Sequence, residues 1–245
     1  MISAAEIKFV KSLSQKKFRD KEGLFTVEGE KLVAEALSSS FEVVKVYRTA
    51  DIGEAAMARI SALSSPSPAL AIVKRPEDIF GAKLPSKGLF LALDGIRDPG
   101  NLGTIIRTAD WFGVDGIYCS PDTVDCFNPK VVQATMGAIF RVKIHYTPIP
   151  EICSCAAKAD GRVYGTFLDG ENLYEKSLSN GAERPSVIVI GNEAKGISPA
   201  VGACVSDRLY IPPYPAGNPG SESLNAAVAA AVTVAEFRRR VKTGN

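Results

Sequence analysis

A regular alternation of short apolar runs with segments of helical periodicity organises the chain from residue 89 onward. The apolar runs predict strands at 89–94, 116–120, 141–146, 162–168, 186–191 and 208–212. The periodic segments predict helices at 101–112, 129–138, 151–159, 199–205 and 223–241. Strands that alternate with helices build a mainly parallel sheet covered on both faces. Because ligands of such sheets bind beyond the carboxyl ends of the strands, we expect a functional site there.

The first part of the chain predicts a smaller α/β unit. Helices are expected at 3–13, 30–37 and 52–63, and strands at 24–27, 41–47 and 70–73, with a charged turn at 16–23. A segment rich in glycine and proline, 76–88, indicates a boundary. We therefore predict two domains, residues 1–85 and residues 86–245, in an α/β fold.

Composition narrows the function classes. The formal net charge is +2, so no overall basic excess indicates a nucleic-acid partner. Residues 1–21 nevertheless carry six Lys and Arg residues against two acids, which fits either phosphate contact or a merely solvated helix. Five cysteines without CxxC spacing and a single histidine, His145, predict free thiols and no metal site. Without a signal-like or membrane-spanning run, we expect a cytoplasmic protein with no membrane partner.

The first loop of interest follows the strand at 89–94. A turn at Asp98-Pro99-Gly100 precedes a helix whose predicted N-cap is Asn101. Helical spacing places an apolar stripe toward the core, namely Leu102, Ile105, Ile106, Ala109 and Phe112. Thr104, Arg107 and Trp111 share the opposite face. That face is either an ordinary solvated surface or part of a site.

Two further loops follow later strands. Gly191-Asn192-Glu193-Ala194-Lys195-Gly196 ends a strand and leads to Ser198-Pro199, which cap and begin a helix. The segment 212–225 leads into an alanine-rich helix capped by Ser221 or Ser223. Its predicted buried stripe is Leu224, Ala227, Val228, Ala231, Val232 and Ala235. Neither a dinucleotide-binding GxGxxG after the first strand nor a phosphate-binding GxxxxGK[ST] is present.

The three loops together closely resemble the SpoU (TrmH) family of RNA ribose 2′-O-methyltransferases, within the SPOUT superfamily. Asn101-Leu102-Gly103 with Arg107-Thr108 matches the first family motif, and Gly191-Asn192-Glu193 with Gly196 matches the second. Ile211-Pro212 and Ser223-Leu224-Asn225 match the third. The resemblance covers residues 89–241, and residues 6–80 more loosely resemble a small substrate-RNA-binding domain. The chain departs from the family in a longer third loop and in Gln133, where an arginine is frequent.

The resemblance implies a C-terminal trefoil knot, S-adenosylmethionine (S-adenosyl-L-methionine) as cofactor, an obligate homodimer and RNA as substrate. Residues implied to hold the cofactor are Gly191, Ile211 and Leu224, completed by Thr166, Phe167 and Leu168. Residues implied for catalysis are Arg107, Asn101, Glu193, Ser223 and Asn225. Ribosomal RNA, above all 23S or large-subunit rRNA, is favoured as the target because of the front domain, with transfer RNA as the alternative.

Methyl transfer to a ribose hydroxyl requires alignment of two reactants and removal of a weakly acidic proton. His145 lies on a strand remote from the three loops, which leaves Arg107 and Glu193 as polar candidates. Because a guanidinium is a poor base, we expect Arg107 chiefly to stabilise the developing alkoxide and to anchor the neighbouring phosphate. Whether it also takes the proton stays open. Glu193, Ser223 and Asn225 would orient Arg107 and the ribose.

Two other function classes stay open at this point. A non-catalytic RNA-binding protein could keep the methyltransferase fold, and a generic nucleotide-binding α/β protein would bind a cofactor without need of RNA. Label transfer from S-adenosylmethionine to RNA separates these classes from an enzyme. Trp111, one turn from Arg107, is expected at a dimer interface or over the RNA.

Overall fold

The computed structural model describes residues 2–79, 83–215 and 222–240. Its contacts divide the chain into two compact units. One comprises Met1–Glu77 with Asp125–Arg141, and the other comprises Asp78–Val124 with Val142–Asn245. The segment 125–141, which the sequence assigned to the second domain, therefore packs with the N-terminal unit. The boundary near residue 85 stays a prediction.

The larger unit holds a six-stranded sheet in the order β6-β5-β4-β8-β7-β9, in which every pair of neighbours is parallel. The strands are β4 (Gly88–Asp94), β5 (Gly116–Cys119), β6 (Ile144–Tyr146), β7 (Arg162–Asn172), β8 (Pro185–Gly191) and β9 (Asp207–Tyr210). The predicted parallel α/β fold is thus confirmed. Central strands β4 and β8 are almost wholly buried, which explains why they read as continuous apolar runs.

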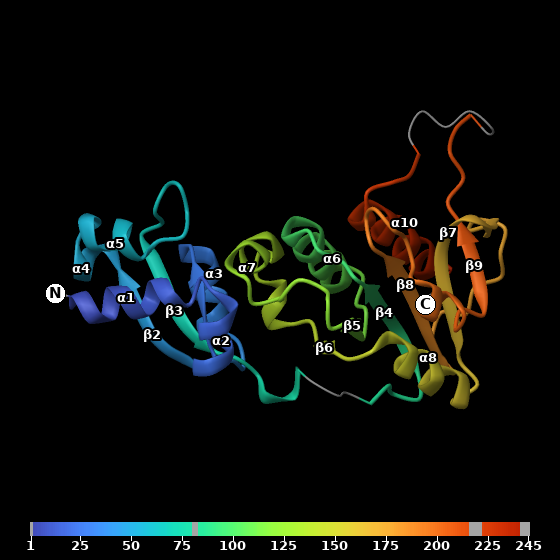
Figure 1. Ribbon diagram of the computed structural model, residues 1–245, viewed down its shortest axis with the longest axis horizontal. Coiled ribbons are helices and arrows are strands. Elements are labelled where there is room, and N and C mark those ends of the chain that lie inside the picture. Colours follow the sequence, from blue (N-terminus) through green and yellow to red (C-terminus); the bar gives the residue numbers. More distant parts are fainter. Residues whose placement is uncertain (1, 80–82, 216–221, 241–245) are drawn as a thin grey trace, which may run out of the picture. The chain divides into compact units, whose positions relative to one another are not determined.

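Helices cover both faces of this sheet (Figure 1). Helices α8 (Ile149–Lys158) and α9 (Pro199–Gly202) pack on one face, through Ile152 and Val201 among others, against Phe90 of β4 and Val187 of β8. Helices α6 (Pro99–Trp111) and α10 (Ala226–Arg239) lie on the other face and pack against each other. The predicted trefoil knot stays a prediction, because residues 216–221, between β9 and α10, lie outside the described residues.

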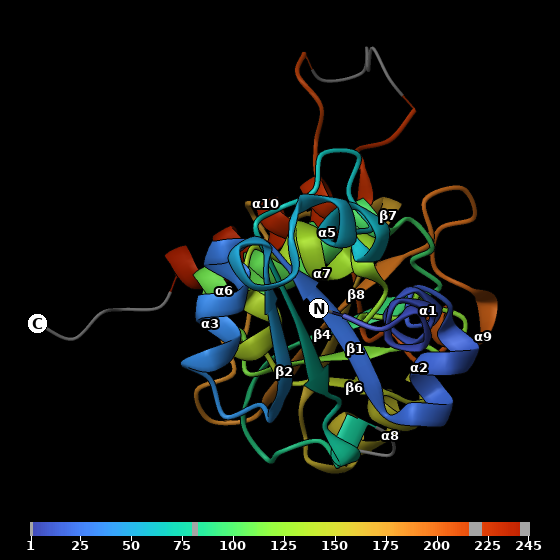
Figure 2. The same cartoon turned by 90° about the vertical axis from the view of Figure 1, so that its left-hand side faces the viewer.

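The smaller unit contains an antiparallel sheet in the order β1-β3-β2. Its strands are β1 (Leu24–Glu28), β2 (Val43–Arg48) and β3 (Ala69–Lys74), and its helices are α1 (Ala4–Ser12), α2 (Lys16–Glu22), α3 (Glu30–Leu37), α4 (Thr49–Ile52), α5 (Glu54–Ile60) and α7 (Pro129–Thr135). Short 3₁₀ turns occur at Glu77–Ile79 and Ala138–Phe140. Helices α1 and α3 lie on opposite sides of the sheet (Figure 2).

The charged turn predicted at 16–23 is wrong, because these residues form helix α2. Lys16 pairs with Asp20 one turn later at 2.5 Å, and Gly23 ends the helix in the left-handed region with φ 65°. Arg19 explains why the helix forms here. Its side chain is 2% exposed and donates through Nε and Nη2 to Asp125 Oδ2, at 3.0 and 2.7 Å. It also donates to the carbonyl oxygens of Leu13 and Ser14.

Arg19 therefore does not belong to a phosphate-contacting surface, although the sequence counted it among six N-terminal cations. Removing one partner of a buried pair leaves an uncompensated charge and costs about 3–5 kcal/mol. The Arg19–Asp125 pair consequently ties the segment that begins at Asp125 to helix α2, which accounts for its place in the smaller unit.

Arginines at the end of α10 hydrogen-bond to two neighbouring segments, the end of α6 and the residue that follows β7. Arg238 Nε donates to the carbonyl oxygen of Phe112 at 2.8 Å, and Arg240 Nη2 donates to the carbonyl oxygen of Leu173 at 3.0 Å. Hydrogen bonds from Arg239 and Arg240 lower the pKa of the buried Glu236 carboxyl to about 2, against the cost of its burial. The carboxylate is therefore charged at neutral pH and pairs with both Arg239 and Arg240.

All five cysteines are free thiols, as expected. Among the helices of residues 2–79, 83–215 and 222–240, none is both long and apolar enough to cross a membrane.

Candidate active site

Helix α6 begins two residues earlier than the sequence predicted. Asp98 is the N-cap, and its Oδ1 accepts from the backbone N–H of Asn101 at 2.8 Å. Pro99 occupies the first helical position, which suits a residue that lacks an N–H. The prediction that Asn101 caps the helix is therefore wrong, and its side chain is available for other contacts.

Helix α10 is capped by Asn225 and not by a serine. Asn225 Oδ1 accepts from the backbone N–H groups of Ala227 and Val228, at 2.9 and 3.3 Å. The predicted cap Ser223 is exposed and lies two residues before Asn225, and the alternative, Ser221, lies outside the described residues. The cap aims the amide nitrogen of Asn225 away from the helix.

These two asparagines form a hydrogen-bonded row with Glu193. Asn225 Nδ2 donates to Asn101 Oδ1 at 2.9 Å, and Asn101 Nδ2 donates to Glu193 Oε1 at 2.9 Å. The direction of the row is fixed at both ends, because backbone N–H groups of α10 can only donate and a carboxylate can only accept. One residue from each of the three predicted loops is thereby joined, over sequence separations of 124 and 92 positions.

The second loop is closed on itself and bound to the first. Asn192 and Gly196 exchange two backbone hydrogen bonds, at 3.0 and 2.9 Å, and Asn192 Oδ1 accepts from Ala194 and Lys195 N–H groups. Asn192 Nδ2 donates to the carbonyl oxygen of Gly95 at 2.6 Å. Asp94 Oδ2, at the end of β4, accepts from the N–H of Ser198 at 2.7 Å, so both ends of the loop are fixed to the first loop.

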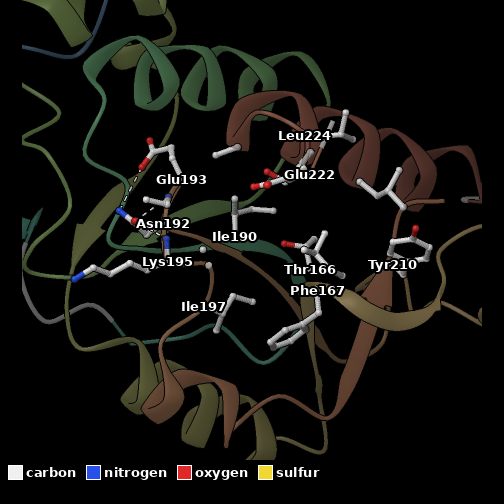
Figure 3. Close-up of a pocket in the computed structure, with 18 residues that line it drawn as sticks. Thr166, Phe167, Ile190, Asn192, Glu193, Lys195, Ile197, Tyr210, Glu222 and Leu224 are labelled. Carbon is white, nitrogen blue, oxygen red and sulfur yellow. Dashed lines mark hydrogen bonds between the residues drawn. The ribbon is translucent and has the colours of Figure 1, made fainter. Parts of the chain in front are cut away.

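A cavity of about 590 Å³ lies at the carboxyl ends of β8 and β9 and beside the middle of β7 (Figure 3). All six residues that the resemblance implies for the cofactor line it, namely Thr166, Phe167, Leu168, Gly191, Ile211 and Leu224. Glu193 and Ser223 line it as well. Its apolar walls include Ile190 and Ile197, and Figure 3 shows Lys195 extending away from Thr166 and Tyr210. The volume lies within the usual range for small-molecule sites.

Arg107 is not among the residues lining this cavity. It lies on the exposed face of α6 with Thr104 and Trp111, as predicted, and Trp111 is 84% exposed. Within the part of the chain that the structure describes, no hydrogen bond or ion pair engages the Arg107 guanidinium. A single chain therefore joins Asn101, Glu193 and Asn225 and leaves Arg107 apart.

The predicted buried stripe of α10 is wrong in part. Leu224 and Val228 are 47% and 48% exposed, whereas the buried side chains are those of Ala226, Ala227, Ala230, Thr233, Val234, Glu236 and Phe237. Most side chains of this helix are small, so helical periodicity alone does not distinguish its faces. The apolar side chains of Leu224 and Val228 consequently face outward.

His145 lies on β6, at the edge of the sheet that β9 does not occupy, and its ring stacks on Tyr118 with centroids 5.6 Å apart. Its predicted remoteness from the three loops is confirmed. The sequence analysis assigned no role to Asp94, Asp98 or Asn192, although the structure shows that they shape the loops. An aspartate before Pro99 and an asparagine three residues before Lys195 are recognisable turn and cap signals that could have indicated the roles of Asp98 and Asn192.

The SpoU rRNA methylase family model matches residues 88–235, more than half of the chain. The chain belongs to this family. A second model, of an MRM3-like substrate binding domain, matches residues 4–68. The enzyme class is therefore that of the RNA 2′-O-methyltransferases, and the SpoU match contains all eleven residues of the expected site.

A similar curated relative is 23S rRNA (guanosine(2553)-2′-O)-methyltransferase RlmP of Bacillus subtilis, which is 33% identical over 95% of this chain and 96% of its own length. A solved structure from Porphyromonas gingivalis, assigned to the TrmH family of RNA methyltransferases, is 40% identical with a TM-score of 0.87, covering 98% of this chain and 99% of that one. An AdoMet-bound rRNA methyltransferase from Sinorhizobium meliloti is 28% identical with a TM-score of 0.83, covering 98% and 97%.

Proposed function

We propose that this SpoU-family protein transfers a methyl group from S-adenosylmethionine to the 2′-hydroxyl of one ribose in ribosomal RNA. The observation that carries the proposal is the row Asn225–Asn101–Glu193, which ends at the wall of a cofactor-sized cavity. A row of fixed direction presents its donors and acceptors without reorganisation, which suits a reaction that depends on alignment.

The cavity fits S-adenosylmethionine in size and in the character of its walls. Ile190, Ile197 and Phe167 offer apolar surface to an adenine ring, and the ends of β8 and β9 offer backbone polar groups. When bound, the cofactor supplies a methyl group activated by a sulfonium. Gly191, Ile211 and Leu224, with Thr166, Phe167 and Leu168, are the residues we assign to its binding.

Arg107 is assigned to the substrate hydroxyl. A guanidinium that stays protonated stabilises the developing alkoxide as the hydroxyl proton passes to water, and it binds the adjacent phosphate through its planar fork. Glu193, Asn101, Asn225 and Ser223 are assigned to orient the ribose. A free arginine on an exposed helix face is available for such a contact, whereas a paired one would first have to break its ion pair.

A homodimer explains why Arg107 lies outside the cavity of its own chain. Trp111 on α6 and Val228 on α10 expose apolar surface on two helices that run in parallel, joined near their starts by Asn101–Asn225 and near their ends by Phe112–Arg238. Apolar surface of this kind is typical of interfaces between subunits. We propose that a second copy covers it and that Arg107 of each chain serves the cavity of the other.

The substrate is assigned to large-subunit rRNA, and transfer RNA is the alternative. Support comes from the similarity to RlmP and from the match of residues 4–68 to a substrate-binding domain. Residues 1–85 would bind the RNA and residues 86–245 would carry out the transfer. Five free thiols are compatible with a reducing compartment such as the cytoplasm, where we place the reaction.

The proposal is tested by incubating the full chain with tritiated S-adenosylmethionine and with separately purified large-subunit rRNA, small-subunit rRNA and tRNA, all transcribed without modification. We expect label in large-subunit rRNA. Label in tRNA alone would favour the alternative substrate. RNA binding without transfer to any of the three would indicate a non-catalytic protein that keeps the fold.

A further inference from the structure

Strand β7 departs from regular pairing where it reaches the cavity. Thr166 and Glu171 both face Leu209 of β9, so the four residues from Phe167 to Gly170 form a bulge between them. Two residues of this bulge, Phe167 and Leu168, line the cavity. The position of the bulge therefore decides the shape of one cavity wall.

The backbone of the bulge approaches β9 closely at Gly170. A Cβ atom at this position would lie 2.6 Å from the carbonyl carbon of Leu209 and 2.7 Å from that of Arg208. No side chain fits at such distances, so glycine allows the contact. This contact fixes the end of the bulge. Phe167 and Leu168 lie at its start, so a different contact must hold them in place.

Arg208 of β9 contacts two other residues of the bulge. Its guanidinium carbon lies 3.5 Å from the centroid of the Phe167 ring, and Nη2 donates to Asp169 Oδ1. This hydrogen bond lowers the pKa of the Asp169 carboxyl, so the pair is charged at neutral pH. A flat guanidinium can stack on a ring and pair with a carboxylate at once, which the ammonium of lysine cannot do.

We propose that Arg208 is a positioning residue for the cofactor cavity: it stacks on Phe167, pairs with Asp169 and so holds the bulge where Phe167 forms the cavity wall. The inference rests on the proposed binding of S-adenosylmethionine in this cavity. Arg208 itself is not among the residues that line the cavity, so its effect on the cofactor passes through the Phe167 ring.

The test compares Arg208→Ala with Arg208→Lys, Phe167→Leu and the double variant, and with Arg184→Ala as the matched control. Arg184 is an exposed arginine paired with the exposed Asp160, and it does not line the cavity. We expect Arg208→Ala to raise the Kd for S-adenosylmethionine, measured by calorimetry, about five- to tenfold. Arg208→Lys should recover only part of this loss, and Arg184→Ala should bind as the parent does.

In the Phe167→Leu background, removal of Arg208 should change the Kd less than about twofold, because the ring through which it acts is gone. For catalysis, the KM for the cofactor should rise while kcat at saturating cofactor stays constant. Equal losses from Arg208→Ala in both backgrounds, or no loss in either, would overturn the proposal.

Amide hydrogen exchange of the ligand-free protein separates this inference from the proposed function. Arg208→Ala should speed exchange at residues 167–170 and leave β8 unchanged. If the parent protein fails to bind S-adenosylmethionine, the proposed function fails, while the exchange result still decides whether Arg208 holds the bulge. Unchanged exchange at residues 167–170 would contradict the positioning role.

Discussion

Arg107→Ala is expected to lower kcat for methyl transfer about a thousandfold, with little change in the Kd for S-adenosylmethionine. Removal of one group that stabilises a developing oxyanion typically costs 10²–10³ in rate, and Arg107 is also assigned to anchor a phosphate. The cofactor affinity should persist because Arg107 is assigned to the hydroxyl and phosphate of the RNA and not to the cofactor. Single-turnover kinetics with saturating RNA and calorimetry with the cofactor measure the two quantities separately.

Arg107→Lys tests whether the reaction requires the planar guanidinium or only its positive charge. Lysine keeps the positive charge and cannot make two parallel hydrogen bonds to a phosphate, so kcat should stay at least about tenfold below that of the parent. Arg184→Ala serves as the control for loss of an exposed arginine. Near-normal turnover by Arg107→Lys would show that the positive charge is sufficient and that the two parallel hydrogen bonds are not required.

Gly191→Ala is expected to abolish cofactor binding, with a Kd at least about a hundredfold higher. An added Cβ would lie 2.3 Å from both the carbonyl carbon of Gly196 and the amide nitrogen of Ile197. These are backbone atoms at the closed end of the second loop, so they cannot swing aside as a side chain would. The loop must open, which displaces the cavity wall and Glu193 with it.

Gly196→Ala is the matched control in the same loop. Gly196 has φ +68° and nothing within 4 Å of an added Cβ, so alanine there meets backbone strain alone, worth about 1 kcal/mol. We expect binding within about tenfold of the parent. Equal defects in the two variants would show that the loop tolerates no substitution. The short distances from an added Cβ at Gly191 would then not explain the loss of binding.

Mixing Arg107→Ala with Gly191→Ala tests the shared site. If Arg107 serves the cavity of the partner, a mixed dimer carries one intact pair of arginine and cavity. Random exchange makes half of the dimers mixed, so about a quarter of the parental activity should return. If Arg107 serves its own cavity, each chain of a mixed dimer lacks one component and no activity returns.

The sheet of the larger unit could be predicted because its strands are buried on both faces. Such strands appear as unbroken apolar runs, and their alternation with helices leaves few arrangements other than a parallel sheet. Helix α2 could not be found in this way. Its buried side chain is a charged one, Arg19, whose partner Asp125 is 106 positions away.

The sequence predicts which residues form the hydrogen-bonded row Asn225–Asn101–Glu193, but it does not predict which of them contact each other. Asn101, Glu193 and Asn225 each follow a different strand, so their common edge follows from a parallel sheet. That Asn101 contacts both others depends on the cap of α6, where Asp98 takes the role predicted for Asn101. Likewise, the exposure of Leu224 and Val228 depends on which side of an alanine-rich helix meets α6, and helical periodicity does not decide this.

Nucleoside analysis of the methylated RNA is the most direct test of the central claim. Large-subunit rRNA would be incubated with the full chain and S-adenosylmethionine carrying a deuterated methyl group, digested to nucleosides and examined by mass spectrometry. Transfer to a 2′-hydroxyl places the added mass on the ribose of one nucleoside, and it makes the adjacent phosphodiester resistant to alkali. A label found on a base, or none at all beside an active control enzyme, would contradict the account.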